Sequence, residues 1–99
     1  MQDAESCATM SELRALIDRI DTDLVALLAA RQACIDRAVV LKQGEALPAR
    51  IPHRVDEVLD RVRRASEARG LDPALSDVLW RTMIEWAIAR EARVLGDDT

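Results

Sequence analysis

The feature that most constrains the fold is a long helical period in the first half of the chain. Ser11 can act as an N-cap, and neither Pro nor Gly interrupts the stretch that follows before Gly44. Apolar residues recur there at the three- and four-residue spacing of an amphipathic helix: Leu13, Ile17, Ile20, Leu24, Leu27, Ile35 and Val39. A helix over Ser11–Lys42 is about 47 Å long, whereas a compact chain of this size has a radius of gyration near ~13 Å. The pattern therefore predicts a partner chain along the helix.

Two further helices are predicted downstream. Residues 43–52 carry one Gly and two Pro and are expected to form a loop, with Pro52 in the first turn of the second helix. That helix ends at Gly70, and one of its faces carries Val55, Val58, Leu59 and Val62.

The third helix is predicted from Pro73 to Leu95, with Asp72 as its N-cap. Its apolar stripe is Leu75, Leu79, Met83 and Trp86. The expected organisation is a flexible leader at 1–10, one all-α helical domain at 11–96 and an acidic tail at 97–99.

Composition excludes several classes of protein. The chain is 49% hydrophobic and 32% charged, which is typical of a globular domain. A net charge of −4, two Trp and no Phe or Tyr argue against nucleic-acid binding. No apolar run approaches a membrane span and no export signal is recognisable, so a cytoplasmic location is expected. Cys7 and Cys34 form no metal-binding motif and are expected to be reduced thiols.

Two cations interrupt the apolar seam of the first helix. The seam reaches Arg31, resumes, and then reaches Lys42, eleven positions or about three turns later on the same face. A buried cation without a partner is costly. Either the two side chains extend to solvent along their apolar stems, or they face a polar cavity that an anion fills. Two such cations would suit a small ligand with two acidic groups.

Arg14 lies 17 positions before Arg31. Along a helix this separates the two residues by about 25 Å, so one small ligand cannot reach both in the same chain. In an antiparallel dimer, Arg14 of one chain could approach Arg31 of the other. The alternative is that Arg14 is a solvated residue of the first turns.

The run LRALIDRIDTDLVALLAAR, the Lys42 that follows, the Pro-containing loop and the later IEWAIARE together resemble the all-helical, AroQ-type chorismate mutase family. The resemblance extends from about Ser11 to Leu95. It implies three-helix chains in an intertwined homodimer. It also implies the pericyclic rearrangement of chorismate to prephenate, a step of aromatic amino acid biosynthesis, without cofactor or metal.

The resemblance also implies roles for the cations. Arg14 of the partner chain would bind one carboxylate of the substrate. Arg31 would bind the other carboxylate or the side-chain end. Lys42 would donate a hydrogen bond to the ether oxygen, on which negative charge grows in the transition state.

Three positions depart from the family pattern. Glu91 stands where a Gln usually donates to the ether oxygen, and an ionised Glu can only accept. The hypothesis is that Glu91 is protonated in the working state; the alternative is an ordinary salt-bridged helix residue. His53 takes the place of a Glu that contacts the ring hydroxyl, and Ala87 takes the place of a Ser.

A related activity of the same fold is a second prediction for this chain. Isochorismate-pyruvate lyase, which serves salicylate biosynthesis, resembles the mutase and uses the same Arg, Arg and Lys set. The leader with Cys7, the DRID run and the Trp of IEWAIARE are somewhat closer to that lyase. Mutase is the first prediction and lyase the second. A non-catalytic helical interaction module is a third reading, which the intact Arg14, Arg31 and Lys42 set disfavours.

Overall fold

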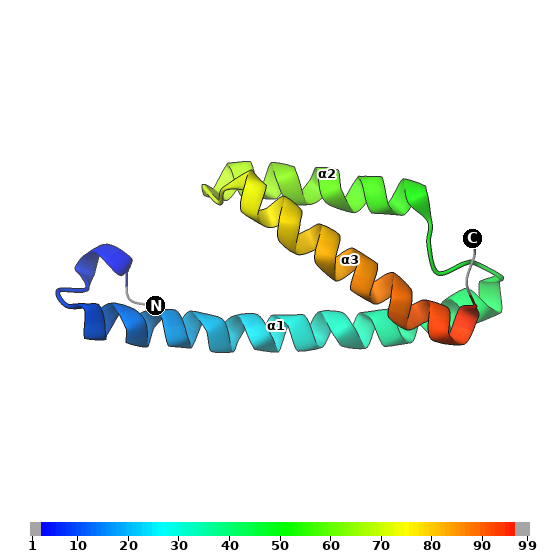
Figure 1. The fold of residues 1–99 in the computed structure, drawn as a ribbon, viewed down its shortest axis with the longest axis horizontal. Coiled ribbons are helices and arrows are strands. Elements are labelled where there is room, and N and C mark those ends of the chain that lie inside the picture. Colours follow the sequence, from blue (N-terminus) through cyan, green and yellow to red (C-terminus); the bar gives the residue numbers. More distant parts are fainter. Residues whose placement is uncertain (1–2, 97–99) are drawn as a thin grey trace. The chain divides into compact units, whose positions relative to one another are not determined.

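The computed structural model describes residues 3–96, so the tail predicted at 97–99 and the first two residues of the leader lie outside it. A short 3-10 helix, Ala4–Ser6, precedes three α-helices (Figure 1): α1 (Met10–Glu45), α2 (Pro52–Arg69) and α3 (Pro73–Leu95). Residues 3–96 contain no strand. The all-α, three-helix prediction is confirmed.

The chain divides into two compact units, residues 1–34 and residues 35–99. In the first, α1 begins with a capping box. The Thr9 hydroxyl accepts from the Glu12 backbone N–H at 3.1 Å, and the Glu12 carboxylate accepts from the Ala8 N–H at 2.8 Å. The helix therefore begins at Met10, and the prediction of Ser11 as its N-cap is wrong. Leu16 is buried in this unit.

The end of α1 differs from the prediction. The helix continues through Gly44 to Glu45, so the connecting loop is 46–51 rather than 43–52. Ala46 adopts a left-handed φ of 57°, and the Leu47 N–H donates to the Lys42 carbonyl at 2.9 Å. This pairing closes the helix end in the manner usually provided by glycine.

The second unit contains the α2–α3 hairpin, whose bounds agree with the prediction. Gly70 ends α2 with a φ of 73°, and the Leu71 N–H donates to the Ser66 carbonyl at 2.9 Å. The Asp72 carboxylate then caps α3 by accepting from the Ala74 N–H at 2.9 Å. Near the turn, the buried hydroxyls of Ser66 and Ser76 are joined by a hydrogen bond of 2.8 Å.

The buried face of α3 is not the predicted apolar stripe. The buried residues are Ser76, Ile84, Ala87 and Glu91. This face contacts two helices, because Ser76 is hydrogen-bonded to Ser66 of α2 and Glu91 to Lys42 of α1. Leu75, Leu79 and Trp86 of the stripe are instead exposed.

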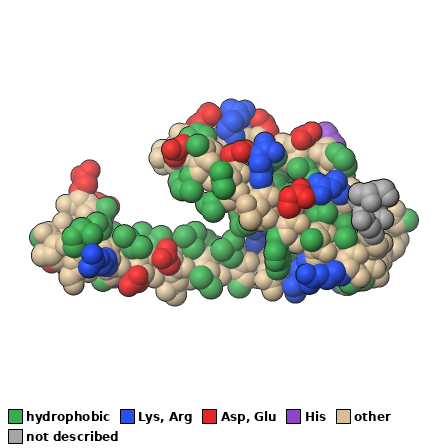
Figure 2. Space-filling model, in the orientation of Figure 1, with side chains coloured by type: hydrophobic (Ala, Val, Ile, Leu, Met, Phe, Trp, Pro, Cys, Tyr) green, Lys and Arg blue, Asp and Glu red, His purple; other side chains and the backbone are tan. Residues whose placement is uncertain are grey.

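Helix α1 also exposes large apolar side chains. Four residues of its seam, predicted to meet a partner, are exposed in the single chain: Ile17, Ile20, Leu24 and Leu27. Figure 2 shows hydrophobic side chains along the surface of α1. None of the described helices is both long enough and apolar enough to cross a membrane. Exposed apolar surface of this extent in a protein usually marks an interaction site.

Candidate active site

Lys42 lies in the last turn of α1 and joins that helix to the loop and to α3. Its ammonium donates to the Glu91 carboxylate oxygen Oε1 at 2.6 Å and to the Ala49 carbonyl at 2.8 Å. The Lys42 side chain is 18% exposed and that of Glu91 is 5% exposed. A backbone carbonyl and a buried carboxylate thus hold the ammonium in one place.

Glu91 reaches this position because it follows Ala87 by one helical turn on the buried face of α3. Burying a carboxylate is unfavourable unless a cation and hydrogen bonds compensate for the lost water. Lys42 provides that compensation. Glu91 is therefore ion-paired with Lys42 in the described structure, and its protonation during turnover stays a prediction.

The loop at 46–51 carries a second charged contact to α3. The guanidinium of Arg50 donates from both terminal nitrogens to the two carboxylate oxygens of Glu85, at 2.6 and 2.8 Å. This two-pronged geometry is the strongest form of the Arg–carboxylate contact. The hydrogen bond from Arg50 lowers the pKa of Glu85 below its ordinary value.

Asp36 and Arg90 make a further link between α1 and α3. Arg90 donates to the two carboxylate oxygens of Asp36 at 2.6 and 3.2 Å, and its guanidinium lies 5.2 Å from the centre of the Trp86 ring. The hydrogen bond that Arg90 donates to Asp36 lowers the pKa of Asp36 and raises the pKa of Arg90. Because Arg90 immediately precedes Glu91, this pair fixes the segment of α3 that faces Lys42.

An open pocket of about 470 Å³ lies beside Lys42. It is lined by the end of α1, the start of the loop and the end of α3: Lys42, Gln43, Ala46, Leu47, Pro48, Val94 and Leu95.

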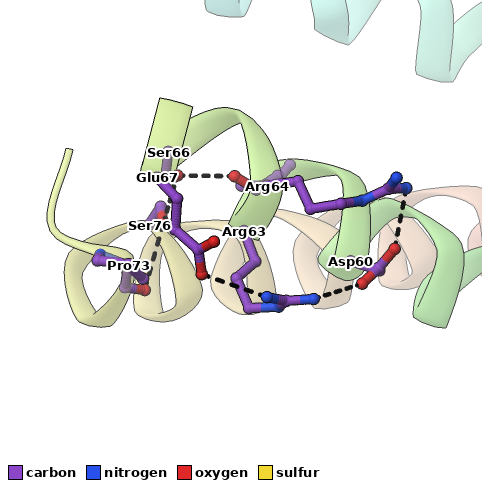
Figure 3. A network of polar contacts seen from close by, with 8 residues as sticks. Asp60, Arg63, Arg64, Ser66, Glu67, Pro73 and Ser76 are labelled. Atoms are coloured by element: carbon purple, nitrogen blue, oxygen red, sulfur yellow. Dashed lines mark hydrogen bonds and ion pairs between the residues drawn. The ribbon is translucent and has the colours of Figure 1, made fainter. Parts of the chain in front are cut away.

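A second hollow, of about 510 Å³, lies between α2 and α3 near their turn. Its charged lining residues are paired with one another or with neighbours. Arg63 binds Asp60 at 2.8 Å and Glu67 at 3.2 Å, as Figure 3 shows, and Arg81 binds Asp77 at 2.8 Å. These cations are neutralised by carboxylates of their own or the next turn, whereas Lys42 is paired with a carboxylate of a different helix.

The predicted site residues fall into three groups. Lys42, Ala87 and Glu91 belong to the second unit, where Lys42 and Glu91 are in direct contact and Ala87 is buried one turn away. His53 is exposed in the first turn of α2. Arg14 is exposed and Arg31 is partly buried in the first unit, and their approach to Lys42 stays a prediction.

The sequence analysis missed the Ala49 carbonyl and the two cross-element pairs, Arg50–Glu85 and Asp36–Arg90. One signal was available. Arg50 stands between Pro48 and Pro52, which restrict the backbone around it, although they do not indicate which residue Arg50 contacts. Residues 3–96 contain no group of His, Cys, Asp and Glu that could hold a metal ion, and both cysteines are free thiols.

Chemically, this arrangement is suited to stabilising charge. A fixed ammonium in a largely water-excluded position stabilises an oxygen on which negative charge develops, without reorganisation during the reaction. A lysine ammonium has three N–H donors, and Ala49 and Glu91 accept from two of them. Their positions set the direction of the third.

Comparison with known proteins identifies the family to which the chain belongs. Residues 13–92 match the family described as chorismate mutase type II. The chain belongs to this family. A curated relative, isochorismate pyruvate lyase from Pseudomonas aeruginosa, is 35% identical over 94 residues, which is 94% of this chain and 91% of the relative. The predicted family is confirmed, and the protein is a chorismate mutase-like enzyme.

Proposed function

We propose that the protein rearranges chorismate to prephenate, with Lys42 donating its third N–H to the ether oxygen of the breaking C–O bond. The observation that carries the proposal is the fixed Lys42 ammonium, held by Glu91 at 2.6 Å and Ala49 at 2.8 Å. The transition state gains negative charge on the ether oxygen, so a cation already in place lowers the barrier. The pocket would also hold the enolpyruvyl group over the ring, an orientation effect.

The two arginines complete the proposed pocket. Arg31 stands eleven positions before Lys42 on α1, which gives the two residues the same helical face. Arg31 would bind one carboxylate of the substrate and Arg14 of a second chain the other, since a guanidinium is suited to two-pronged carboxylate recognition.

A homodimer is part of the proposal. The exposed apolar residues of α1 and α3 give a second copy a large surface to cover, and an isolated helix with such a face is only marginally stable in water. An isologous dimer with α1 helices antiparallel would place Arg14 of each chain near Arg31 of its partner.

The second candidate is elimination of pyruvate from isochorismate to give salicylate. The identity to isochorismate pyruvate lyase over nearly the whole chain favours it. Both reactions break the ether C–O bond of a closely similar dicarboxylate, so the role of Lys42 is the same in both.

Product analysis tests the proposal. Purified protein is incubated separately with chorismate and with isochorismate, and the products are separated by chromatography. Prephenate supports the first candidate, and salicylate with pyruvate supports the second. Lys42→Ala should abolish turnover, whereas Arg81→Gln, which removes an exposed ion pair with Asp77 at a distance from Lys42 in sequence, should retain it. No turnover of either substrate by the wild-type protein would refute both candidates.

Subunit mixing tests the shared pocket. Arg14→Ala and Lys42→Ala should each be inactive alone. After unfolding and refolding together in equal amounts, half of the dimers are mixed, and each mixed dimer has one intact pocket. The mixture should recover roughly a quarter of the wild-type activity. No recovery, with mixed dimers demonstrated by mass spectrometry, would show that Arg14 does not come from the partner.

A further inference from the structure

The loop at 46–51 provides the Ala49 carbonyl, one of the two acceptors that hold the Lys42 ammonium. The next residue in the loop, Arg50, contacts Glu85 of α3. The Ala49 carbonyl accepts from Lys42 at 2.8 Å, and Ala49 is buried. That carbonyl belongs to the planar peptide unit that ends at the backbone nitrogen of Arg50. A contact that restricts the backbone of Arg50 therefore also restricts the orientation of the carbonyl.

The guanidinium of Arg50 is fixed by Glu85 through the two hydrogen bonds of 2.6 and 2.8 Å. Helix α3 thus holds the ammonium of Lys42 in two ways. Glu91 contacts it directly, and Glu85 acts on it through Arg50 and the Ala49 carbonyl. Rigid placement of both acceptors determines where the third N–H of Lys42 points.

The loop needs such an anchor because its start is unfavourable. Ala46 has a φ of 57°, a conformation that an L-residue with a Cβ adopts at an energetic cost. Pro48 and Pro52 restrict the backbone on either side of Arg50, so the segment moves as a stiff unit. The segment continues into α2 at Pro52, and the contact of Arg50 with Glu85 links its middle to α3.

We propose that Arg50 and Glu85 are a positioning pair, which aligns the Lys42 ammonium for catalysis by holding the Ala49 carbonyl against it. Neither residue is assigned contact with the substrate. Their side chains are 38% and 58% exposed, and exposed ion pairs contribute little to folding. Loss of the pair should therefore reduce turnover much more than it reduces stability. The inference rests on the proposed function, because it assigns the pair a role in the turnover that Lys42 supports.

The test uses Arg50→Gln and Glu85→Gln, with Arg81→Gln as the control that removes an exposed ion pair from the same unit. Steady-state kinetics are measured on whichever substrate the wild-type protein turns over. A displacement of about 1 Å at a catalytic group can cost roughly 100-fold, so kcat should fall about 10- to 100-fold with KM changed less than about 3-fold. Arg81→Gln should match the wild-type protein.

The exchanged pair, Arg50→Glu with Glu85→Arg, should recover at least a tenth of the wild-type kcat, because it rebuilds the link with the charges reversed. Two Gln variants are used so that, if circular dichroism shows one of them to be poorly folded, the kcat of the other still tests the proposal. A kcat within about 2-fold of wild type in a folded Gln variant would overturn the proposal. So would a loss of kcat that the exchanged pair does not reverse.

Amide hydrogen exchange separates this inference from the proposed function. In both Gln variants, exchange at Leu47, the loop amide that donates to the Lys42 carbonyl at 2.9 Å, should accelerate at least 10-fold, while exchange in α2 stays as in the wild-type protein. This measurement needs no substrate. If the wild-type protein turns over neither chorismate nor isochorismate, the proposed function fails, and unchanged exchange in the loop separately overturns the positioning role.

Discussion

The Lys42–Glu91 pair is expected to be the most sensitive polar contact of the second unit, and its two partners should respond unequally to substitution. Lys42→Met keeps much of the side-chain volume and removes the charge. It leaves the Glu91 carboxylate, 5% exposed, without its cation. Glu91→Leu leaves Lys42 unpaired, but that side chain is 18% exposed and retains the Ala49 carbonyl as an acceptor.

The magnitudes follow from this asymmetry. Breaking a buried ion pair by removing one partner costs about 3–5 kcal/mol, and partial exposure of Lys42 places the cost of Lys42→Met near ~3 kcal/mol. Glu91→Leu should cost about 1 kcal/mol, because Lys42 can reach water along its stem. The double variant should lie within about 1 kcal/mol of wild type, since it removes both charges together. The coupling energy is then about 4 kcal/mol.

Urea unfolding of the four proteins, at one fixed protein concentration, measures these values. Arg81→Met and Asp77→Leu form the matched control cycle, because that pair has a similar distance of 2.8 Å but is exposed, and its coupling should be several-fold smaller. Equal costs for the two single variants, or a coupling no larger than that of the control, would refute the reasoning.

Three further outcomes are expected. Glu91→Gln should raise activity near neutral pH, because an amide can donate where an ionised carboxylate cannot. The wild-type activity should fall as pH increases, and that of the variant should depend less on pH. A flat wild-type activity profile together with an inactive Gln variant would contradict this. Gly44→Ala should stabilise by about 1 kcal/mol and Gly70→Ala destabilise by a similar amount in thermal unfolding, since both sites have space for a Cβ but only Gly70 has a positive φ. Arg90→Leu should return the pKa of Asp36 toward its ordinary value in a carboxyl NMR titration. Because the folded-state pKa of Asp36 is lowered, the stabilisation from this pair is present above the ordinary value and is lost as pH falls through the lowered one.

The helix bounds that depend on local signals could be predicted from the sequence. Pro52, Gly70, Asp72 and Pro73 each act within one or two residues of the helix end that they determine, and α2 and α3 begin and end as predicted. The end of α1 was missed because Gly44 is a plausible stop, whereas the structure closes the helix two residues later with Ala46. A left-handed alanine has no sequence signature.

The start of α1 had a signal that was overlooked. Thr9 and Glu12 have the spacing of a capping box, and Ser11 within that motif drew the prediction two positions along the chain. The apolar stripe of α3 was identified from the same kind of period as the seam of α1, and most of it is exposed in the single chain. Periodicity identifies a helical face but does not say whether that face is covered by the same chain or left exposed.

The site was predictable in part. The interruption of an apolar seam by a cation drew attention to Lys42, and family resemblance implied that Glu91 acts at the same ether oxygen; the direct contact between the two is a finding of the structure. The Ala49 carbonyl could not have been identified, because every residue has a backbone carbonyl and only the fold selects one. Arg50 and Glu85 are 35 positions apart, and charges of both signs are common on each segment, so their pairing depends on the packing of the loop against α3.

Glu91 therefore has two effects on the proposed reaction, and they oppose each other. As an anion it holds the Lys42 ammonium at 2.6 Å and fixes the direction of the remaining N–H, which favours catalysis. The same charge lies close to an ether oxygen that becomes more negative in the transition state, which disfavours it. Protonation of Glu91 removes the repulsion and converts an acceptor into a donor, while a carbonyl oxygen remains to hold Lys42. Retention of the lysine then depends more heavily on Ala49, and through it on Arg50 and Glu85. The positioning pair should therefore matter more in Glu91→Gln, whose neutral amide holds Lys42 less strongly, than in the wild-type protein.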